Sequence, residues 1–276
     1  MANEWTGERL ETFVHNDSTI EHLHRYAIVN EFIKNKVVLD IACGEGYGSS
    51  LLSASARFVT GIDIDNTVIA HASQKYKKDN LLFKRGSVEN IPFEDAHFDV
   101  VVSFETLEHV SGHTSMLSEI KRVMKPGGLL ILSTPNKKSY SDLYDYKNPF
   151  HKKELYLQEL EKLLNEHFIF YSIHYQSIHT ASLIINSSGN SLKLYEGDYH
   201  KIRTMDTIEP LYFIALCSDH ALPALPSSLF TSKGTLETAI REKELSVKNS
   251  LSYRIGHTIL FPAKLAYKIF SKRFNR

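Results

Sequence analysis

The chain has few cysteines and no long apolar segment. Its two cysteines, Cys43 and Cys217, form neither a disulfide framework nor a Cys-x-x-Cys metal site, and this usage favours a reducing, cytoplasmic compartment. No apolar run approaches the roughly 18 residues of a membrane-spanning helix. The N-terminal sequence MANEWTGERLE lacks the positive charge and apolar core of a signal peptide. We therefore expect neither secretion by that route nor a membrane-spanning segment.

The chain also lacks net charge, because 32 lysines and arginines balance 32 aspartates and glutamates. No overall field attracts nucleic acid, which is therefore not an expected partner. The histidines include no His-Glu-x-x-His motif, and no metal site is predicted. With 276 residues the chain can form one α/β domain and an extension.

A glycine-rich segment organises the first half of the chain. Residues 36–49 read KVVLDIACGEGYGS, in which an apolar run is followed by Gly44, Gly46 and small residues suited to a helix start. This pattern predicts a strand, a tight turn and a helix. Glycines let the backbone approach a ligand closely, and the helix N-terminus offers unpaired N–H groups. The segment is therefore a candidate loop for a nucleoside-like ligand.

Two acids indicate which ligand this is. Asp40 ends the apolar run before the glycines, where it can meet an ammonium group, and Asp63 ends the next apolar run, where its carboxylate can accept both ribose hydroxyls. An NAD site would favour Gly-x-Gly-x-x-Gly, but the third position counted from Gly44 is Ser49. An acid before the turn would also face a pyrophosphate. S-adenosylmethionine, a nucleoside with a charged tail, fits better.

The glycine segment resembles that of the class I S-adenosylmethionine-dependent methyltransferases. The resemblance continues through SVENIPFEDAHFDVVVSFETLEHV and RVMKPGGLLILSTPN. It implies a methyltransferase enzyme with S-adenosyl-L-methionine as its cofactor. The short TGER, EHLHRY and SYRIG patterns are similar to methyltransferases associated with bacterial surface-polysaccharide biosynthesis.

Apolar runs and helical segments alternate after residue 20. Predicted helices cover 20–33, 66–76, 113–124 and 152–165, and predicted strands after the first cover 58–63, 81–85, 98–103 and 129–134. Continuous apolar runs are typical of buried parallel strands, and the alternation predicts right-handed crossovers. The resemblance adds strands at 168–176 and 211–217, the last of them antiparallel. We therefore expect an α/β, Rossmann-like, doubly wound sheet of seven strands, mostly parallel, followed by a helical C-terminal tail.

The predicted methyltransferase domain comprises residues 1–220, with an N-terminal lid and an insertion around 177–208 that folds onto the acceptor face. Residues 221–276 are predicted to be a Pro-rich linker and a basic helical tail. The basic residues of the tail recur every four positions, at Lys264, Lys268, Lys272 and Arg276. Such a helix either lies on an anionic membrane surface or docks on its own domain or on a partner's tail. The first alternative places a cytoplasmic protein at the inner face of the membrane, and the last implies a homo-oligomer.

The candidate cofactor residues lie beyond the carboxyl ends of the strands or on the first helix. They are Arg25, Asp40, Ala42, Gly44, Gly46, Asp63, Ile64, Ser87, Val88 and Phe104. The resemblance implies that Arg25, on the polar face of its helix, pairs with the methionine carboxylate; the alternative is a solvated arginine. Ser87 departs from the acid common in the family, which leaves the adenine amino group to Ser87, Glu89 or the backbone. Phe104 is expected near the sulfonium.

A long loop over residues 135–150 is the candidate acceptor site. Its Tyr140, Tyr144 and Tyr146 suit a polyhydroxylated acceptor, although such a loop can also be a surface loop held by its aromatic residues. A sugar hydroxyl needs a base, and histidine, with an ordinary pKa of about 6.5, is suited to that role. His109 and His151 are the candidate bases.

Glu105 and Glu108 are candidates to orient either histidine or to cap a helix, and His109 can alternatively be structural. Three functions follow from the sequence. The first is O-methylation, or N-methylation, of a sugar in a bacterial surface glycan or nucleotide sugar. The second is methylation of a quinone-type small molecule, and the third is a non-catalytic scaffold that binds the cofactor.

Overall fold

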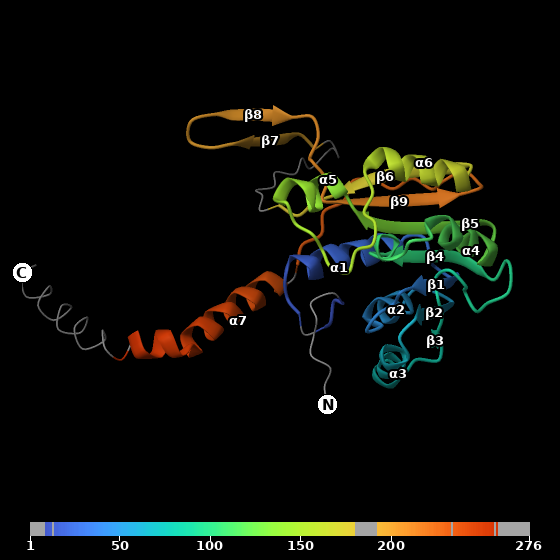
Figure 1. Ribbon diagram of the computed structural model, residues 1–276, viewed down its shortest axis with the longest axis horizontal. Coiled ribbons are helices and arrows are strands. Elements are labelled where there is room, and N and C mark those ends of the chain that lie inside the picture. Colours follow the sequence, from blue (N-terminus) through green and yellow to red (C-terminus); the bar gives the residue numbers. More distant parts are fainter. Residues whose placement is uncertain (1–8, 13, 180–191, 233, 257, 259–276) are drawn as a thin grey trace, which may run out of the picture. The chain divides into compact units, whose positions relative to one another are not determined.

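The computed structural model describes residues 9–12, 14–179, 192–232, 234–256 and 258 (Figure 1). The chain divides into two compact units. One comprises Met1–Thr12 and Glu21–Leu229, and the other comprises Phe13–Ile20 and Phe230–Arg276. The first unit contains the sheet and every candidate site residue named above.

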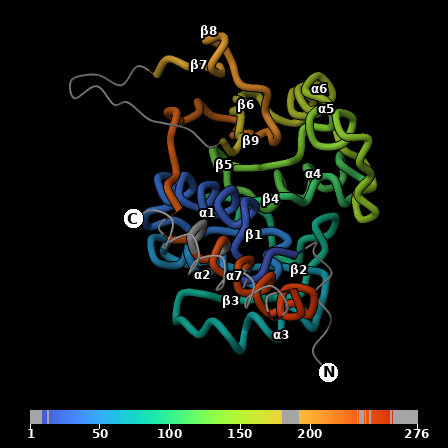
Figure 2. Tube along the Cα trace, turned by 90° about the vertical axis from the view of Figure 1, so that its left-hand side faces the viewer, coloured from blue at the N-terminus to red at the C-terminus, as the bar shows by residue number. Residues whose placement is uncertain are grey.

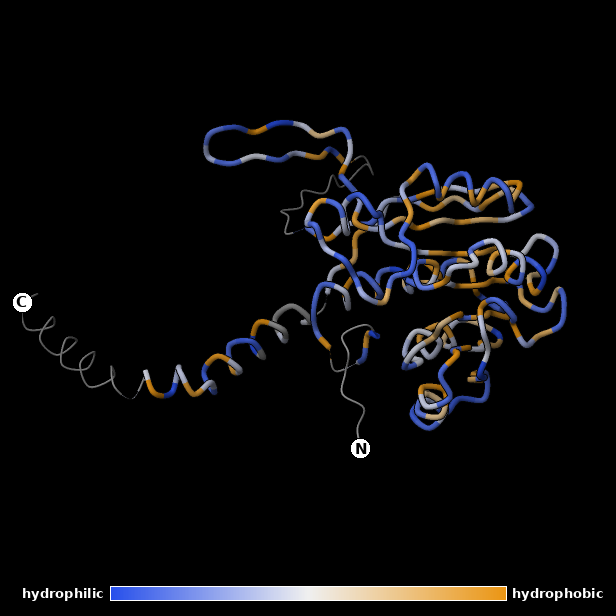
Figure 3. The backbone as a smooth tube through the Cα atoms, viewed as in Figure 1, coloured by the Kyte–Doolittle hydropathy of each residue, from blue (hydrophilic) through white to orange (hydrophobic). Residues whose placement is uncertain are grey.

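A seven-stranded sheet forms the centre of the first unit. Its strands are β1 (Val37–Ile41), β2 (Phe58–Asp63), β3 (Leu81–Arg85), β4 (Phe98–Phe104), β5 (Met124–Pro135), β6 (Phe170–Gln176) and β9 (Tyr212–Ser218), in the order β3-β2-β1-β4-β5-β9-β6. Strands β1 to β5 are parallel, whereas β9 runs antiparallel to both β5 and β6. The Rossmann-like architecture is thus confirmed, and hydrophobic residues follow these strands (Figure 3).

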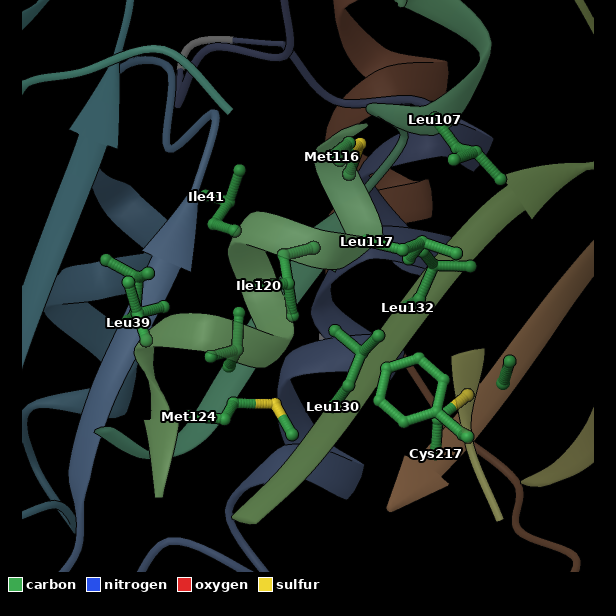
Figure 4. Close-up of a cluster of buried hydrophobic side chains, with 14 of the residues drawn as sticks. Leu39, Ile41, Leu107, Met116, Leu117, Ile120, Met124, Leu130, Leu132 and Cys217 are labelled. Carbon is green, nitrogen blue, oxygen red and sulfur yellow. The ribbon is translucent and has the colours of Figure 1, made fainter. Parts of the chain in front are cut away.

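Helices cover both faces of this sheet (Figure 2). They are α1 (Asp17–Val29), α2 (Tyr47–Leu52), α3 (Asn66–Lys75), α4 (His113–Val123) and α6 (Leu157–His167). Side chains of α4 and α6 pack on one face in a buried cluster, and those of α1 and α2 pack on the other. Figure 4 shows Leu117 of α4 close to Leu132 of β5. Such double coverage explains why the strand sequences are apolar without alternation.

The strand order reverses at β1, which has β2 on one side and β4 on the other. In open parallel sheets the ligand crevice lies beyond the carboxyl ends of the strands at such a point. Asp40 in β1, Asp63 at the end of β2 and Phe104 at the end of β4 are therefore brought to one edge of the sheet.

Two of the predicted boundaries around the acceptor loop are wrong. The loop 135–150 contains the short helix α5 (Lys137–Tyr140) and the 3-10 helix η2 (Asp142–Tyr144). The helix expected over 152–165 begins only at Leu157, where the Tyr156 N–H donates to Glu159 at 3.0 Å. The residues before it are held elsewhere, because the N–H groups of Lys152 and Lys153 both donate to the Glu108 carbonyl.

Strand β5 also begins earlier than predicted, at Met124, so that Pro126, Gly127 and Gly128 belong to the strand and do not precede it. The insertion contains a hairpin of β7 (Leu194–Gly197) and β8 (Ile202–Met205), which pair with each other. Its described apolar side chains are exposed, 61% for Tyr195 and 75% for Ile202. The expectation that the insertion folds onto the acceptor face is therefore wrong for this hairpin.

The second unit contains α7 (Thr235–Asn249), which begins after Gly234 at a positive φ of 82°. Apolar side chains of this helix, including Ile240 and Val247, are exposed. The predicted basic helix with Lys264 to Arg276 lies outside the described residues. Of the helices that the structure describes, none is both long and apolar enough to cross a membrane.

Candidate functional site

The glycine loop leaves open space beside Gly44. Gly44 and Gly46 have positive φ values of 52° and 89°, which favour glycine. A Cβ on Gly46 would lie 2.7 Å from the Phe83 ring, whereas a Cβ on Gly44 would meet no described atom within 4 Å. Gly46 is thus required by packing, and Gly44 faces space that a ligand can fill. The preceding Ala42 is exposed at a φ of 53°.

Asp63 is fixed beside this loop at the end of β2. One carboxylate oxygen accepts the Gly44 N–H at 3.2 Å, and the other accepts the Asp65 N–H at 3.0 Å. Arg9, in the N-terminal arm, reaches the same carboxylate at 3.4 Å and also pairs with Asp65. The carboxylate is nearly buried and aimed at the loop, as ribose binding requires. The described part of the predicted lid therefore contacts the site.

Asp40 lies at the other side of the glycine loop and is 1% exposed. Burial raises its pKa to about 7, although hydrogen bonds from Ser49, at 2.6 Å, and from Tyr26 oppose this rise. A cation beside the carboxyl would restore its charge and remove the cost of that charge. The side chain is thus suited to the ammonium group of a ligand.

Arg25 does not lie on a polar helix face, as the sequence suggested, but is fully buried. Its Nε donates to Gln176 Oε1 at 2.7 Å, and its guanidinium lies 4.4 Å from the centre of the Tyr212 ring. Nη1 is 3.1 Å from a Glu105 oxygen. Neither Nη1 nor Nη2 has a hydrogen-bond acceptor among the described residues, which leaves donors for an anionic group. The error arose because α1 packs against the sheet at this turn, where β6 and β9 supply polar partners.

The remaining cofactor candidates differ in exposure. Ile64 is 64% exposed just beyond β2, and Ser87 and Val88 are partly exposed beyond β3. Ser87 Oγ accepts the Glu89 N–H at 3.2 Å. Phe104 is 5% exposed and packs edge-on against Tyr26, so its ring belongs to the core.

Glu105, a predicted catalytic residue, is directed toward Arg25. It has a φ of 48°, and its carboxylate accepts the Ser133 hydroxyl at 2.6 Å. Together with the ion pair to Arg25, this contact indicates that Glu105 fixes the end of β4 beside β5.

The two candidate bases, His109 and His151, are brought together by the fold. Their ring centres lie 4.9 Å apart in an edge-to-face arrangement. His109 ends the 3-10 helix η1 (Leu107–His109), and its Nδ1 is 3.1 Å from the Phe150 carbonyl. His151 Nδ1 is 2.6 Å from Glu154 Oε1. Tyr140 stacks on His151 with centres 5.4 Å apart.

The other two loop tyrosines contribute less to this cluster. Tyr146 contacts the Tyr140 ring at 6.0 Å and is half exposed, whereas Tyr144 is 71% exposed. Aromatic surface is thus available next to the histidines, but only Tyr140 packs against them.

Glu108 completes the cluster and is fully buried. Its Oε2 accepts the Thr134 hydroxyl at 3.1 Å, while Oε1 has no hydrogen-bond partner among the described residues. Burial, and secondly the charge of Glu105, raise the pKa of Glu108 well above its ordinary value. One ligand atom each from Glu108, His109 and His151 lie within 4.8 Å of one another.

Several site residues were not found from the sequence. Glu154 could have been, because it follows His151 with the His-x-x-Glu spacing of one helical turn. Tyr26, Gln176 and Tyr212 carry no such signal, since they meet Asp40 or Arg25 only through the tertiary structure.

The comparisons with known proteins agree with this geometry. Residues 39–132 match the family model described as "Methyltransferase domain". The chain is 41% identical over 128 residues to the "Probable S-adenosylmethionine-dependent methyltransferase" of Mycolicibacterium smegmatis, a match that covers 46% of this chain and 49% of that protein. It is 36% identical over 118 residues to phthiotriol/phenolphthiotriol dimycocerosates methyltransferase 1 of Mycobacterium ulcerans, covering 42% and 43%. The match thus spans about half the length of these curated relatives.

Among solved structures, the fold is similar to that of the methyltransferase in a complex with the Trm112 activator from Haloferax volcanii. The TM-score is 0.56 with 15% identity, over 74% of this chain and 91% of that chain. This likeness shows the fold alone. The family model and the curated relatives identify residues 39–132 as a methyltransferase domain of the S-adenosylmethionine-dependent type.

Proposed function

We propose that the whole protein is a methyltransferase that transfers the methyl group of S-adenosyl-L-methionine to a hydroxyl group of a small acceptor. The observation that carries this proposal is the pair of nearly buried carboxylates, Asp40 and Asp63, on either side of the open space at Gly44. One carboxylate suits an ammonium group and the other suits a ribose. A methionine nucleoside combines both groups.

When bound, S-adenosylmethionine supplies an electrophilic methyl group. Asp63 holds the ribose hydroxyls, and Asp40 pairs with the ammonium. The free donors of Arg25 suit the carboxylate, for which Glu105 competes. The partly or fully exposed side chains beyond β2 and β3, which are Ile64, Ser87 and Val88, lie where an adenine would be placed.

The acceptor lies, in this proposal, beyond the ends of β4 and β5, beside His109, His151 and Tyr140. An alcohol is almost undissociated at neutral pH, so its methylation requires help with the loss of the proton, and the two imidazoles are suited to give it. The exposed Tyr144 and Tyr146 can pack against sugar rings. This supports a sugar of a bacterial surface glycan or a nucleotide sugar as the acceptor.

A second candidate acceptor is an apolar alcohol or quinone-type molecule. It is favoured by the name of the Mycobacterium ulcerans relative, a methyltransferase for phthiotriol dimycocerosates. A cofactor-binding scaffold without turnover is a function of another class. The C-terminal tail would place the protein at an anionic inner membrane face or hold two copies together.

The test is release of S-adenosylhomocysteine by the full chain with separate panels of nucleotide sugars, surface glycans, quinols and lipid alcohols. Turnover with a sugar panel supports the glycan proposal, and turnover only with quinols or lipid alcohols replaces it by the second candidate. Cofactor binding by calorimetry without turnover on any panel supports the scaffold. Absence of both binding and turnover contradicts the proposed function.

A further inference from the structure

The cluster around Glu108 has the composition of a metal centre. We propose that Glu108, His109 and His151 bind a divalent transition-metal cation, for which Zn²⁺ is the probe, beyond the end of β4. One ligand atom from each residue lies within 4.8 Å of the others. Glu108 is fully buried, and its Oε1 has no hydrogen-bond partner among the described residues. A buried carboxylate oxygen facing two imidazoles is the arrangement that a cation would satisfy.

In each proposed ligand, the atom that does not face the cluster is anchored. Glu108 Oε2 is held by Thr134 Oγ1 at 3.1 Å. His109 Nδ1 is 3.1 Å from the Phe150 carbonyl, and His151 Nδ1 is 2.6 Å from Glu154. Metal-bound histidines commonly donate their second ring N–H to a carbonyl or carboxylate in this way, which fixes the tautomer and orients the ring.

The anchored atoms leave Glu108 Oε1 and the two Nε2 atoms for the cation. His109 Nε2 lies 4.0 Å from Glu108 Oε1. Ligand atoms bound tetrahedrally at about 2.0–2.2 Å lie roughly 3.4 Å apart, so a small side-chain rotation would close the site. His151 Nε2 lies 3.0 Å from the Asn148 amide nitrogen, which must move aside when the cation binds.

Two imidazoles and one carboxylate favour Zn²⁺ and other first-row transition metals over Mg²⁺ and Ca²⁺, which prefer oxygen ligands. The cation would also separate the charges of Glu108 and Glu105, whose repulsion only Arg25 now offsets among the contacts described above. Three protein ligands leave a coordination position open. Its use for an acceptor oxygen rests on the proposed function, whereas binding of the cation does not.

The test uses full-length protein freed of metal with a chelator and titrated with Zn²⁺ in the absence of S-adenosylmethionine. We expect one saturable site by calorimetry, a Co²⁺ absorption spectrum typical of four or five nitrogen and oxygen ligands, and no comparable binding of Mg²⁺. Glu108→Gln keeps the shape of the side chain and should weaken Zn²⁺ binding at least tenfold. Glu154→Gln, which removes only the partner of His151, should weaken it by about 10-fold to 100-fold.

Matched controls separate this site from other histidines. His71→Gln, at an exposed position of α3, should leave Zn²⁺ affinity unchanged. The circular dichroism spectrum of Glu108→Gln shows whether the variant is folded, and His109→Gln provides a second ligand variant if it is not. Absence of saturable Zn²⁺ binding, or equal affinity of the wild type and the folded ligand variants, would overturn the proposal. Cofactor binding is measured separately, so failure of the metal site and failure of the methyltransferase proposal give different results.

Discussion

Replacing Asp40 by asparagine should stabilise the ligand-free protein at neutral pH and weaken its binding of S-adenosylmethionine. Asp40 is 1% exposed, and burial raises its pKa from the ordinary 3.8 to about 7. That gap corresponds to about 4 kcal/mol of unfolding free energy. Asparagine has the same shape and no charge, so it removes the cost of ionising the buried group. It can still accept the hydrogen bond from Ser49.

The sign of the pH dependence follows from the raised pKa. Between about pH 4 and pH 7 the folded state holds a proton on Asp40 that the unfolded state has lost. The contribution of this group is therefore fully present below pH 4 and is lost as the pH rises through 7. The free energy of unfolding of the Asp40→Asn variant, relative to wild type, should rise over this window by up to about 4 kcal/mol.

Cofactor binding should show the opposite response, because the ammonium group requires the ionised carboxylate. Wild-type affinity should fall about tenfold for each pH unit below 7, while the weaker affinity of Asp40→Asn should show no such dependence.

The assay is urea unfolding of the full chain, without cofactor, over the range from about pH 5 to pH 8. Ser49→Ala is the matched control, because it removes a donor to Asp40 but keeps the carboxyl; its loss of stability should extend to higher pH. If the wild type and Asp40→Asn show parallel pH dependence, Asp40 does not titrate in this window and the reasoning is refuted.

Three further outcomes are expected. Asp63→Ala should weaken S-adenosylmethionine binding about tenfold to a hundredfold, since a charged hydrogen-bond partner typically contributes ~1.5–3 kcal/mol; unchanged calorimetric affinity would show that the ribose is held elsewhere. Gly48→Ala should cost about 1–3 kcal/mol in urea unfolding, because its Cβ would lie 2.0 Å from the Tyr26 ring, and wild-type stability of this variant would contradict that close approach. In liposome flotation at low salt, anionic vesicles should carry the full chain but not a chain truncated after Ser228, and equal flotation would reject membrane contact through the tail.

Most of the sheet could be predicted from the sequence because its signals are local. Strands β1 to β4 are continuous apolar runs, and Gly44 follows the first of them within a few residues. Once parallel strands are assumed, their carboxyl ends share one edge, and Asp40 and Asp63 are placed there without knowledge of any contact. The predicted start of α6 failed because its boundary depends on Lys152 and Lys153, whose N–H groups are bound by the distant Glu108 carbonyl.

The sequence by itself determined the fold class and the carboxylates of the proposed cofactor site, since apolar runs and turns act over short distances along the chain. Only the tertiary structure decided that Arg25 is buried against Gln176, 151 positions away. It alone also brought His151 beside His109 and Glu108, because α5 and the segment after it return the chain to the end of β4. Periodicity reports which side of an element is buried, but not which distant side chains meet there, because that depends on how the crossovers pack.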